Sequence, residues 1–182
     1  MIKSTTAVLG LLLVLAGCSG ADDGTVTAAA LPANLCEVVP AAQVQRWALV
    51  EDTHSTDNGG PVNSAECAMS AGSATDAARL EVSVDSLGGG DPESATRFTA
   101  EQFAERCGNV RSQGEFVDTR DECTATRESD GALTLTTLTR LPDSYSVVWV
   151  QLVTPLDEGD AADAAIGDVV EAVRSRVEGA SA

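Results

Sequence analysis

The sequence predicts an α+β fold in which helices pack on an antiparallel sheet. Residues 79–86 alternate between apolar and polar side chains, as in a strand with one buried face. Residues 132–141 and 145–153 are two further strand-like runs, and the turn between them is Pro-Asp-Ser. Residues 160–177 carry apolar side chains at helical spacing. Strands that are joined by short turns form an antiparallel sheet, and the helices that come between them in the sequence pack on this sheet.

The first elements of the domain are weakly patterned. A short helix is predicted to begin at Pro40, with Val44 and Trp47 on its apolar side. Residues 51–64 are rich in turn-forming residues and are predicted to be a loop, and Glu66 to Ala71 to be a short strand.

A longer helix is predicted after the three glycines at 88–90. Asp91 is the expected N-cap and Pro92 the first helical residue. Its expected buried face carries Ala100, Phe103, Ala104 and Cys107. Phe98 lies on the opposite side of this helix, which a single buried stripe does not explain.

The second half of the chain is predicted to contain four strands and a last helix. Residues 115–119 and 122–128 are expected to pair as short strands. Residues 145–153 are apolar on both faces, so this strand is expected at the centre of the sheet. The buried face of the last helix is expected to carry Ala162, Ile166, Val169, Val170, Val173 and Val177.

Charge excludes some partners. The 182 residues carry a formal charge of −17, and without residues 1–17 there are ten arginines, no lysine and 28 acidic residues, a charge of −18. Such a surface repels phosphate backbones and anionic lipid headgroups. We therefore expect no nucleic-acid binding and no polybasic contact with a membrane.

The amino terminus is typical of an exported lipoprotein. Lys3 is followed by an apolar stretch from Ala7 to Leu15, which is too short to span a bilayer. Residues 15–18, Leu-Ala-Gly-Cys, resemble the lipobox of bacterial lipoproteins. The resemblance implies a signal peptide over 1–17 and a diacylglycerol (commonly palmitate-bearing) on Cys18. The alternatives are an ordinary signal peptide with a chance cysteine, or an uncleaved anchor.

This lipoprotein signal sequence predicts the domain organisation. Residues 18–33 are expected to be the acylated cysteine and a flexible linker, because residues 19–33 are small or polar and lack periodicity. A single globular domain is expected over 34–178, followed by a tail over 179–182. The protein is expected on the extracytoplasmic face of the cell membrane, held there by its lipid anchor.

Four further cysteines predict two disulfides in an oxidising compartment. They are Cys36, Cys67, Cys107 and Cys123, and three pairings are possible. We expect Cys36–Cys67 and Cys107–Cys123, because each pair closes a local loop around a predicted helix and its return strand. A four-thiolate metal site is the alternative, but the spacing contains no CxxC. No metal and no cofactor are expected.

The segment from Leu35 to Val44 is similar to the opening of actinobacterial cell-envelope lipoproteins of unknown function. In that group a cysteine and two apolar residues precede a helix that begins with proline, and a second cysteine follows a Gly/Pro-rich loop, as Cys67 does here. Relatives of the LpqN type resemble the PsbP-like α/β/α sandwich. The resemblance implies that fold and a location in the cell envelope, and it implies no catalytic or ligand-binding residue.

Residues for catalysis are scarce. The lone histidine, His54, lies in the predicted loop and is expected to be solvated. The glycines at 88–90 favour a turn over an anion-binding loop, because Asp91 follows them. Asp157, Glu158, Asp160 and Asp163 lack the spacing of an EF-hand and are expected to satisfy the dipole of the last helix.

Trp149 is expected to lie in the core, and the alternative is that it lines a pocket between sheet and last helix with Ile166 and Val170. We therefore expect no enzyme, but a binding or accessory module for an apolar envelope ligand or an envelope protein. The alternatives are a carboxylate-dependent cell-wall hydrolase and a structural envelope protein.

Overall fold

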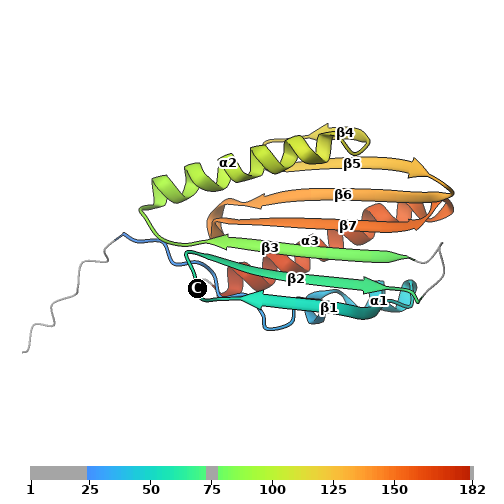
Figure 1. Cartoon of the computed structure of the whole chain (residues 1–182), viewed down its shortest axis with the longest axis horizontal. Helices are drawn as coiled ribbons and strands as arrows, with labels where there is room; N and C mark the ends of the chain where they lie inside the picture. The colour runs from blue at the N-terminus through green and yellow to red at the C-terminus, as the bar shows by residue number, and fades with distance from the viewer. Residues whose placement is uncertain (1–23, 73–77, 181–182) are drawn as a thin grey trace, which may run out of the picture.

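A seven-stranded antiparallel sheet forms the centre of the molecule. The computed structural model describes residues 24–72 and 78–180 (Figure 1). The strand order is β1-β2-β3-β7-β6-β5-β4. The strands are β1 (Val50–Asp57), β2 (Val62–Ser70), β3 (Arg79–Leu87), β4 (Glu115–Asp118), β5 (Glu122–Ser129), β6 (Ala132–Leu141) and β7 (Ser146–Pro155). All pairs of neighbouring strands run antiparallel, so the predicted α+β class is confirmed.

Helices cover both faces of this sheet. Helix α2 (Pro92–Arg111) packs on β4 to β7 on one face, and α3 (Gly159–Ala180) packs on β6 and β7 on the other (Figure 1). The 3₁₀ helix η1 (Leu35–Val38) extends the α3 layer over β1 to β3, and the short helix α1 (Ala41–Arg46) follows it. On the face that carries α2, none of the helices in the described part of the chain lies over β1 to β3 (Figure 1).

The central strand β7 separates two cores. Val148, Val150 and Leu152 are buried on the α3 side, whereas Val147 and Trp149 face the α2 side. Side chains alternate between the faces of a strand, so an apolar run on both parities suits a strand covered on both sides. The prediction that this strand is central is confirmed, since β7 is the fourth strand of seven.

Each core contains one disulfide. Cys36–Cys67 joins η1 to β2 within the α3-side core, and Cys107–Cys123 joins α2 to β5 within the α2-side core. Both predicted pairings are confirmed. The larger, α3-side core is built mainly from Val, Leu and Ala, which matches the aromatic content of 3%.

Region 51–64 was wrongly predicted as a loop. It contains β1 and the start of β2, joined by a short turn. Almost every side chain of β1 is exposed, so the strand has no apolar alternation and is held by its backbone pairing with β2. Acidic side chains such as those of Glu51 and Asp57 suit an edge strand, because charge discourages pairing with other chains.

The globular domain also begins earlier than predicted. Residues 24–33, expected to belong to the flexible linker, pack along the ends of β1 to β3, where Val26, Ala29 and Leu31 are buried. The amide of Ala29 donates to Ser86 Oγ (2.8 Å), and the side-chain amide of Asn63 donates to the Ala29 carbonyl (2.9 Å). The predicted linker residues before Gly24, and the signal peptide, lie outside the described residues.

The carboxyl end also differs slightly from the prediction. Helix α3 runs to Ala180, so the first two residues of the expected tail over 179–182 continue the helix. Every residue expected on the buried face of this helix is buried, from Ala162 to Val177. None of the described helices has an apolar stretch long enough to cross a membrane.

Candidate ligand cleft beside Phe98

Helix α2 is positioned by its amino end. The carboxylate of Asp91 accepts hydrogen bonds from the amide and the hydroxyl of Ser94, both at 2.9 Å, and Pro92 is the first helical residue. The hydrogen bond from the Ser94 amide, followed by that from its hydroxyl, lowers the pKa of Asp91. The predicted N-cap is confirmed.

The buried face of α2 differs in part from the predicted one. Phe98 does not belong to this buried face. The stripe is formed by Ala95, Thr99, Phe103, Cys107 and Val110. Ala104, expected on this face, is exposed, because the stripe begins at Ala95 and its drift around the helix leaves position 104 on the solvent side. Phe98 leaves 44% of its surface exposed.

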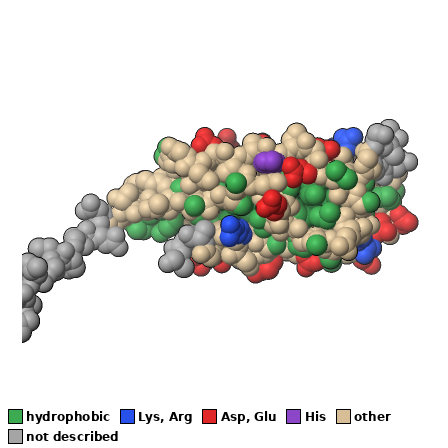
Figure 2. Space-filling model, turned by 90° about the horizontal axis from the view of Figure 1, so that it is seen from below, with side chains coloured by type: hydrophobic (Ala, Val, Ile, Leu, Met, Phe, Trp, Pro, Cys, Tyr) green, Lys and Arg blue, Asp and Glu red, His purple; other side chains and the backbone are tan. Residues whose placement is uncertain are grey.

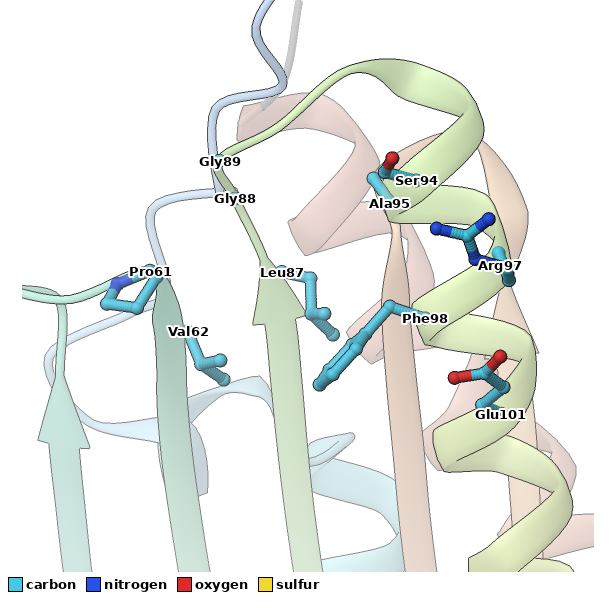
Figure 3. A pocket seen from close by; sticks show the side chains of 10 residues that line it. All are labelled: Pro61, Val62, Leu87, Gly88, Gly89, Ser94, Ala95, Arg97, Phe98 and Glu101. Carbon is cyan, nitrogen blue, oxygen red and sulfur yellow. The ribbon is translucent and has the colours of Figure 1, made fainter.

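Phe98 forms one wall of a surface cleft of about 400 Å³ between α2 and the ends of β2 and β3. Figure 3 shows its ring directed from the helix toward Leu87, with Val62 on the next strand. Val62 and Leu87 are direct cross-strand partners, and Val62 is 39% exposed. The lining residues are Pro61, Val62, Leu87, Gly88, Gly89, Ser94, Ala95, Arg97, Phe98 and Glu101.

The cleft suits an apolar or amphipathic ligand. Pockets that bind small molecules typically enclose about 300–1,000 Å³ and combine apolar walls with a few polar groups. Here the walls are the side chains of Phe98, Val62 and Leu87, and the charged lining residues are Arg97 and Glu101. With Glu101 as the only carboxylate among its lining residues, the cleft does not offer the pair of acids that a glycosidase uses.

The glycines at 88–90 close one end of the cleft. The amide of Gly88 donates to the Pro61 carbonyl (2.7 Å), and that of Gly89 to the Val26 carbonyl (2.7 Å). These two amides are therefore occupied by the protein itself, which agrees with a turn rather than an anion-binding loop. Gly89 and Gly90 have positive φ angles of 82° and 71°, which glycine adopts without strain.

The structure does not bring Trp149, Ile166 and Val170 together in one pocket. Trp149 lies on the α2 side of β7, whereas Ile166 and Val170 are buried on α3 beneath the opposite face. Both α3 side chains are largely buried, with 5% and 6% of their surface exposed. A more polar hollow of about 310 Å³ lies beside Ile166 and Val170, over β5 and β6.

Trp149 lies in the core only in part, and it does not line the hollow beside the last helix. It packs partly against the α2-side core and also lines a hollow of about 250 Å³ on the uncovered face of β1 to β3. Glu66 and Glu81 line this hollow as well, and neither has an ion-pair partner in the described part of the chain. This hollow is smaller and more acidic than the Phe98 cleft.

His54 lies on strand β1 rather than in a loop, and its side chain is 42% exposed. Its Nδ1 lies 2.7 Å from Glu51 Oε1, and Asn34 Nδ2 donates to Glu51 Oε2 (2.9 Å). The hydrogen bond from Asn34, and after it that from His54, lowers the pKa of Glu51. This exposed group of side chains contains no nucleophile, and it is a surface network.

On the face seen in Figure 2, which looks onto the β1 edge, acidic side chains are scattered rather than gathered in one site. Within the described residues no three His, Cys, Asp or Glu side chains are grouped to hold a metal ion. Of the acidic run before α3, Glu158 pairs with Arg46. The Phe98 cleft is therefore the candidate functional site.

Comparisons with known proteins find a distant structural similarity and no match by sequence. No protein-family model matches the chain, and no curated protein matches its sequence. Among solved structures, the extracellular domain of PknH from Mycobacterium tuberculosis is similar, with a TM-score of 0.43 and 11% sequence identity. The match covers 81% of this chain and 98% of that domain.

Proposed function

We propose that the protein is an extracytoplasmic lipoprotein that acts as a non-enzymatic binding module and takes an apolar or amphipathic envelope molecule into the Phe98 cleft. The observation that carries the proposal is the cleft itself, in which an exposed aromatic ring faces two apolar side chains from neighbouring strands. A ring left 44% exposed has a hydrophobic surface that a ligand would remove from water.

The cysteine pattern supports the proposed anchor. The two disulfides use Cys36, Cys67, Cys107 and Cys123, so the fifth cysteine, Cys18, has no cysteine of this chain left to pair with. Thioether attachment of a diacylglycerol to Cys18 gives that sulfur a defined role. Membership of the LpqN-type lipoproteins, with their PsbP-like fold, is part of the same proposal and rests on residues 35–44.

A ligand-binding experiment tests the cleft. The mature chain with Cys18→Ser is incubated with envelope lipid extract, re-purified and analysed for bound lipid by mass spectrometry. We expect co-purifying apolar molecules and a raised melting temperature, and we expect Phe98→Asp to abolish both. Val117→Asp is the matched control, because Val117 is 69% exposed on β4 and does not line the cleft.

The outcome is decisive in either direction. If the Cys18→Ser chain carries no lipid and shows no thermal shift, the binding function is wrong. If Phe98→Asp and Val117→Asp lose ligand equally, the site is not the Phe98 cleft.

The anchor is tested separately on the protein purified from membranes of its natural host. We expect mass spectrometry to find an amino-terminal Cys18 that carries diacylglycerol, with residues 1–17 removed. An intact amino terminus or an unmodified Cys18 thiol would contradict the lipoprotein assignment without affecting the cleft.

A protein partner is the second candidate, and the Trp149 hollow favours it. Glu66 and Glu81 stand there without ion-pair partners in the described structure, beside the partly buried indole of Trp149. Aromatic and charged side chains in this arrangement suit a basic partner surface. Loss of partner binding in Glu66→Gln/Glu81→Gln, with lipid binding retained, would identify this face as the interface.

A further inference from the structure

We propose that the Phe98 cleft receives an acyl chain directly from the bilayer in which the protein itself is anchored. This inference rests on the proposed function, because it requires both the lipid on Cys18 and a ligand in the cleft. It adds the source of the ligand and the side from which it enters.

The chain leaves the domain beside the cleft. Val26 is hydrogen-bonded on both sides to the glycine corner, its amide donating to the Gly90 carbonyl (3.0 Å) and its carbonyl accepting from the Gly89 amide (2.7 Å). Gly88 and Gly89 line the cleft and join β3 to α2 (Figure 3). The described chain therefore begins at the end of the molecule where α2 starts and the cleft lies (Figure 1).

Little chain remains between this point and the anchor. Residues 19–23 separate Cys18 from Gly24. Six Cα-to-Cα steps reach at most about 20 Å when fully extended, and a flexible chain of this length spans about 13 Å on average. Because ten of the fifteen expected linker residues belong to the domain, an anchor on Cys18 would hold Gly24, which lies beside the glycine corner of the cleft, within about 20 Å of the membrane surface.

The opposite end of the sheet lies much farther away. Val62 of β2 lines the cleft, while Ser70 at the other end of that strand is paired with Val50. Eight residues of strand span about 27 Å. Val50 is apolar and, at 66%, more exposed than Phe98 at 44%, so it offers an accessible reporter position at the end remote from the cleft.

The chemistry of the cleft fits an acyl chain. The described residues expose five large apolar side chains, and two of them, Phe98 and Val62, face this cleft. Arg97 and Glu101 line it with one charge of each sign, so its mouth lacks the strong negative charge of the whole chain. An apolar hollow that is held close to a bilayer meets acyl chains at high local concentration.

Photocrosslinking tests the proposal on the tethered protein. The chain from Cys18 is coupled through that thiol to a maleimide lipid in phosphatidylcholine vesicles, since the other cysteines are in disulfides. Benzoylphenylalanine replaces Phe98 in one sample and Val50 in another. We expect lipid adducts at position 98 at least tenfold above those at position 50, and equal labelling at both positions would overturn the proposal.

Linker length supplies an independent readout. Effective concentration falls roughly as the −3/2 power of linker length, so inserting about fifteen Gly/Ser residues before Gly24 lowers labelling at position 98 about sixfold. Labelling that does not change with linker length would show that the short tether does not present the cleft to the bilayer, and would overturn the inference.

A filled cleft separates entry of a chain from mere contact of the surface with lipid. Val62→Trp occupies the hollow opposite position 98 and leaves the reporter itself in place. We expect this variant to lose most of the labelling at position 98. Unchanged labelling would mean that the reporter only touches the bilayer, and the proposal would be wrong.

The soluble chain distinguishes this failure from failure of the proposed function. If the Cys18→Ser chain binds radiolabelled palmitate in solution and Phe98→Asp abolishes that binding, the cleft is a ligand site. The absence of bilayer adducts would then refute only the source and route of the ligand. If neither palmitate nor bilayer lipid reaches position 98, both proposals fail.

Discussion

A Cβ atom placed on Gly88 would lie 2.4 Å from the backbone nitrogen of Ala28 and 2.9 Å from its Cβ. No real Cβ tolerates a backbone atom that close, so the segment at 24–33 and the β3–α2 corner fit together only because residue 88 is glycine. The close contact between Gly88 and Ala28 connects the amino-terminal segment, the sheet and the Phe98 cleft.

Gly88→Ala is therefore expected to push residues 26–29 off the corner. The overlap should cost about 1–3 kcal/mol of the free energy of unfolding and speed amide exchange at Ala29, whose amide donates to Ser86. Urea unfolding and hydrogen exchange measure both. Gly108→Ala is the control, because a Cβ atom at this position of α2 would have no neighbour within 4 Å, and it should stabilise by up to about 1 kcal/mol.

The two phenylalanines of α2 are expected to differ in their contribution to stability. Phe103 is 8% exposed in the α2-side core, so Phe103→Ala should lower the free energy of unfolding by about 3–5 kcal/mol. Phe98 is 44% exposed at the cleft, so Phe98→Ala should cost about 1 kcal/mol or less. Equal losses in urea unfolding would show that the ring of Phe98 belongs to the core.

Replacing both cysteines of one disulfide should lower the free energy of unfolding by an amount that depends on the length of the loop it closes. Cys36–Cys67 closes a separation of 31 residues and Cys107–Cys123 one of 16. The chain-entropy relation gives about 3.7 and about 3.1 kcal/mol, so Cys36→Ala/Cys67→Ala should be the less stable double variant. Urea midpoints under non-reducing conditions measure this order, and the reverse order would mean that native-state packing outweighs loop entropy.

The N-cap of α2 makes stability depend on pH. Hydrogen bonds from Ser94 lower the pKa of Asp91 in the folded state, so its carboxylate favours the folded state above the unfolded pKa of about 3.9. That contribution is lost as the pH falls through the lower, folded-state value. Asp91→Asn should thus be less stable than the natural chain at pH 7, and the difference should shrink in strong acid.

Thermal unfolding at pH 7 and at about pH 2.5 measures this change, on either side of the ordinary aspartate pKa. Asp143→Asn serves as the control, because Asp143 is exposed and makes no side-chain hydrogen bond in the described structure. A difference for Asp91→Asn that does not vary with pH would contradict the role of the charge.

Much of the fold was predictable because its side chains report their surroundings. Alternation over Leu80, Val82 and Val84 identified β3, and all three are buried. Asp91 and Pro92 marked the start of α2 because capping chemistry acts within a few residues. The disulfide pairs followed from the local loops that they close.

Strand β1 and the segment at 24–33 could not be found in this way. The side chains of β1 are exposed, and its order comes from backbone pairing with β2. The segment at 24–33 has no periodicity and is held by side chains distant in sequence, such as Asn63 and Ser86. Such contacts leave no local pattern.

Only one part of the candidate site could be predicted from the sequence. Phe98 was conspicuous because it lies off the buried stripe of its helix, but its partners Val62 and Leu87 belong to strands that only the fold brings near. The alternative grouping of Trp149 with Ile166 in one pocket is not found, because the parity of a strand does not say which helix covers which face. Trp149 faces α2, and its neighbours Val148 and Val150 face α3.

The disulfides also bear on how the chain matures. Cys36 pairs with the next cysteine along the chain, and so does Cys107, so the two covalent rings are consecutive and do not overlap in the sequence. Cys18 emerges before these four, so oxidation in order of arrival yields the native bonds only when Cys18 is acylated and takes no part. For the acylated chain we therefore expect the native disulfides to form without an isomerase that reshuffles mismatched pairs.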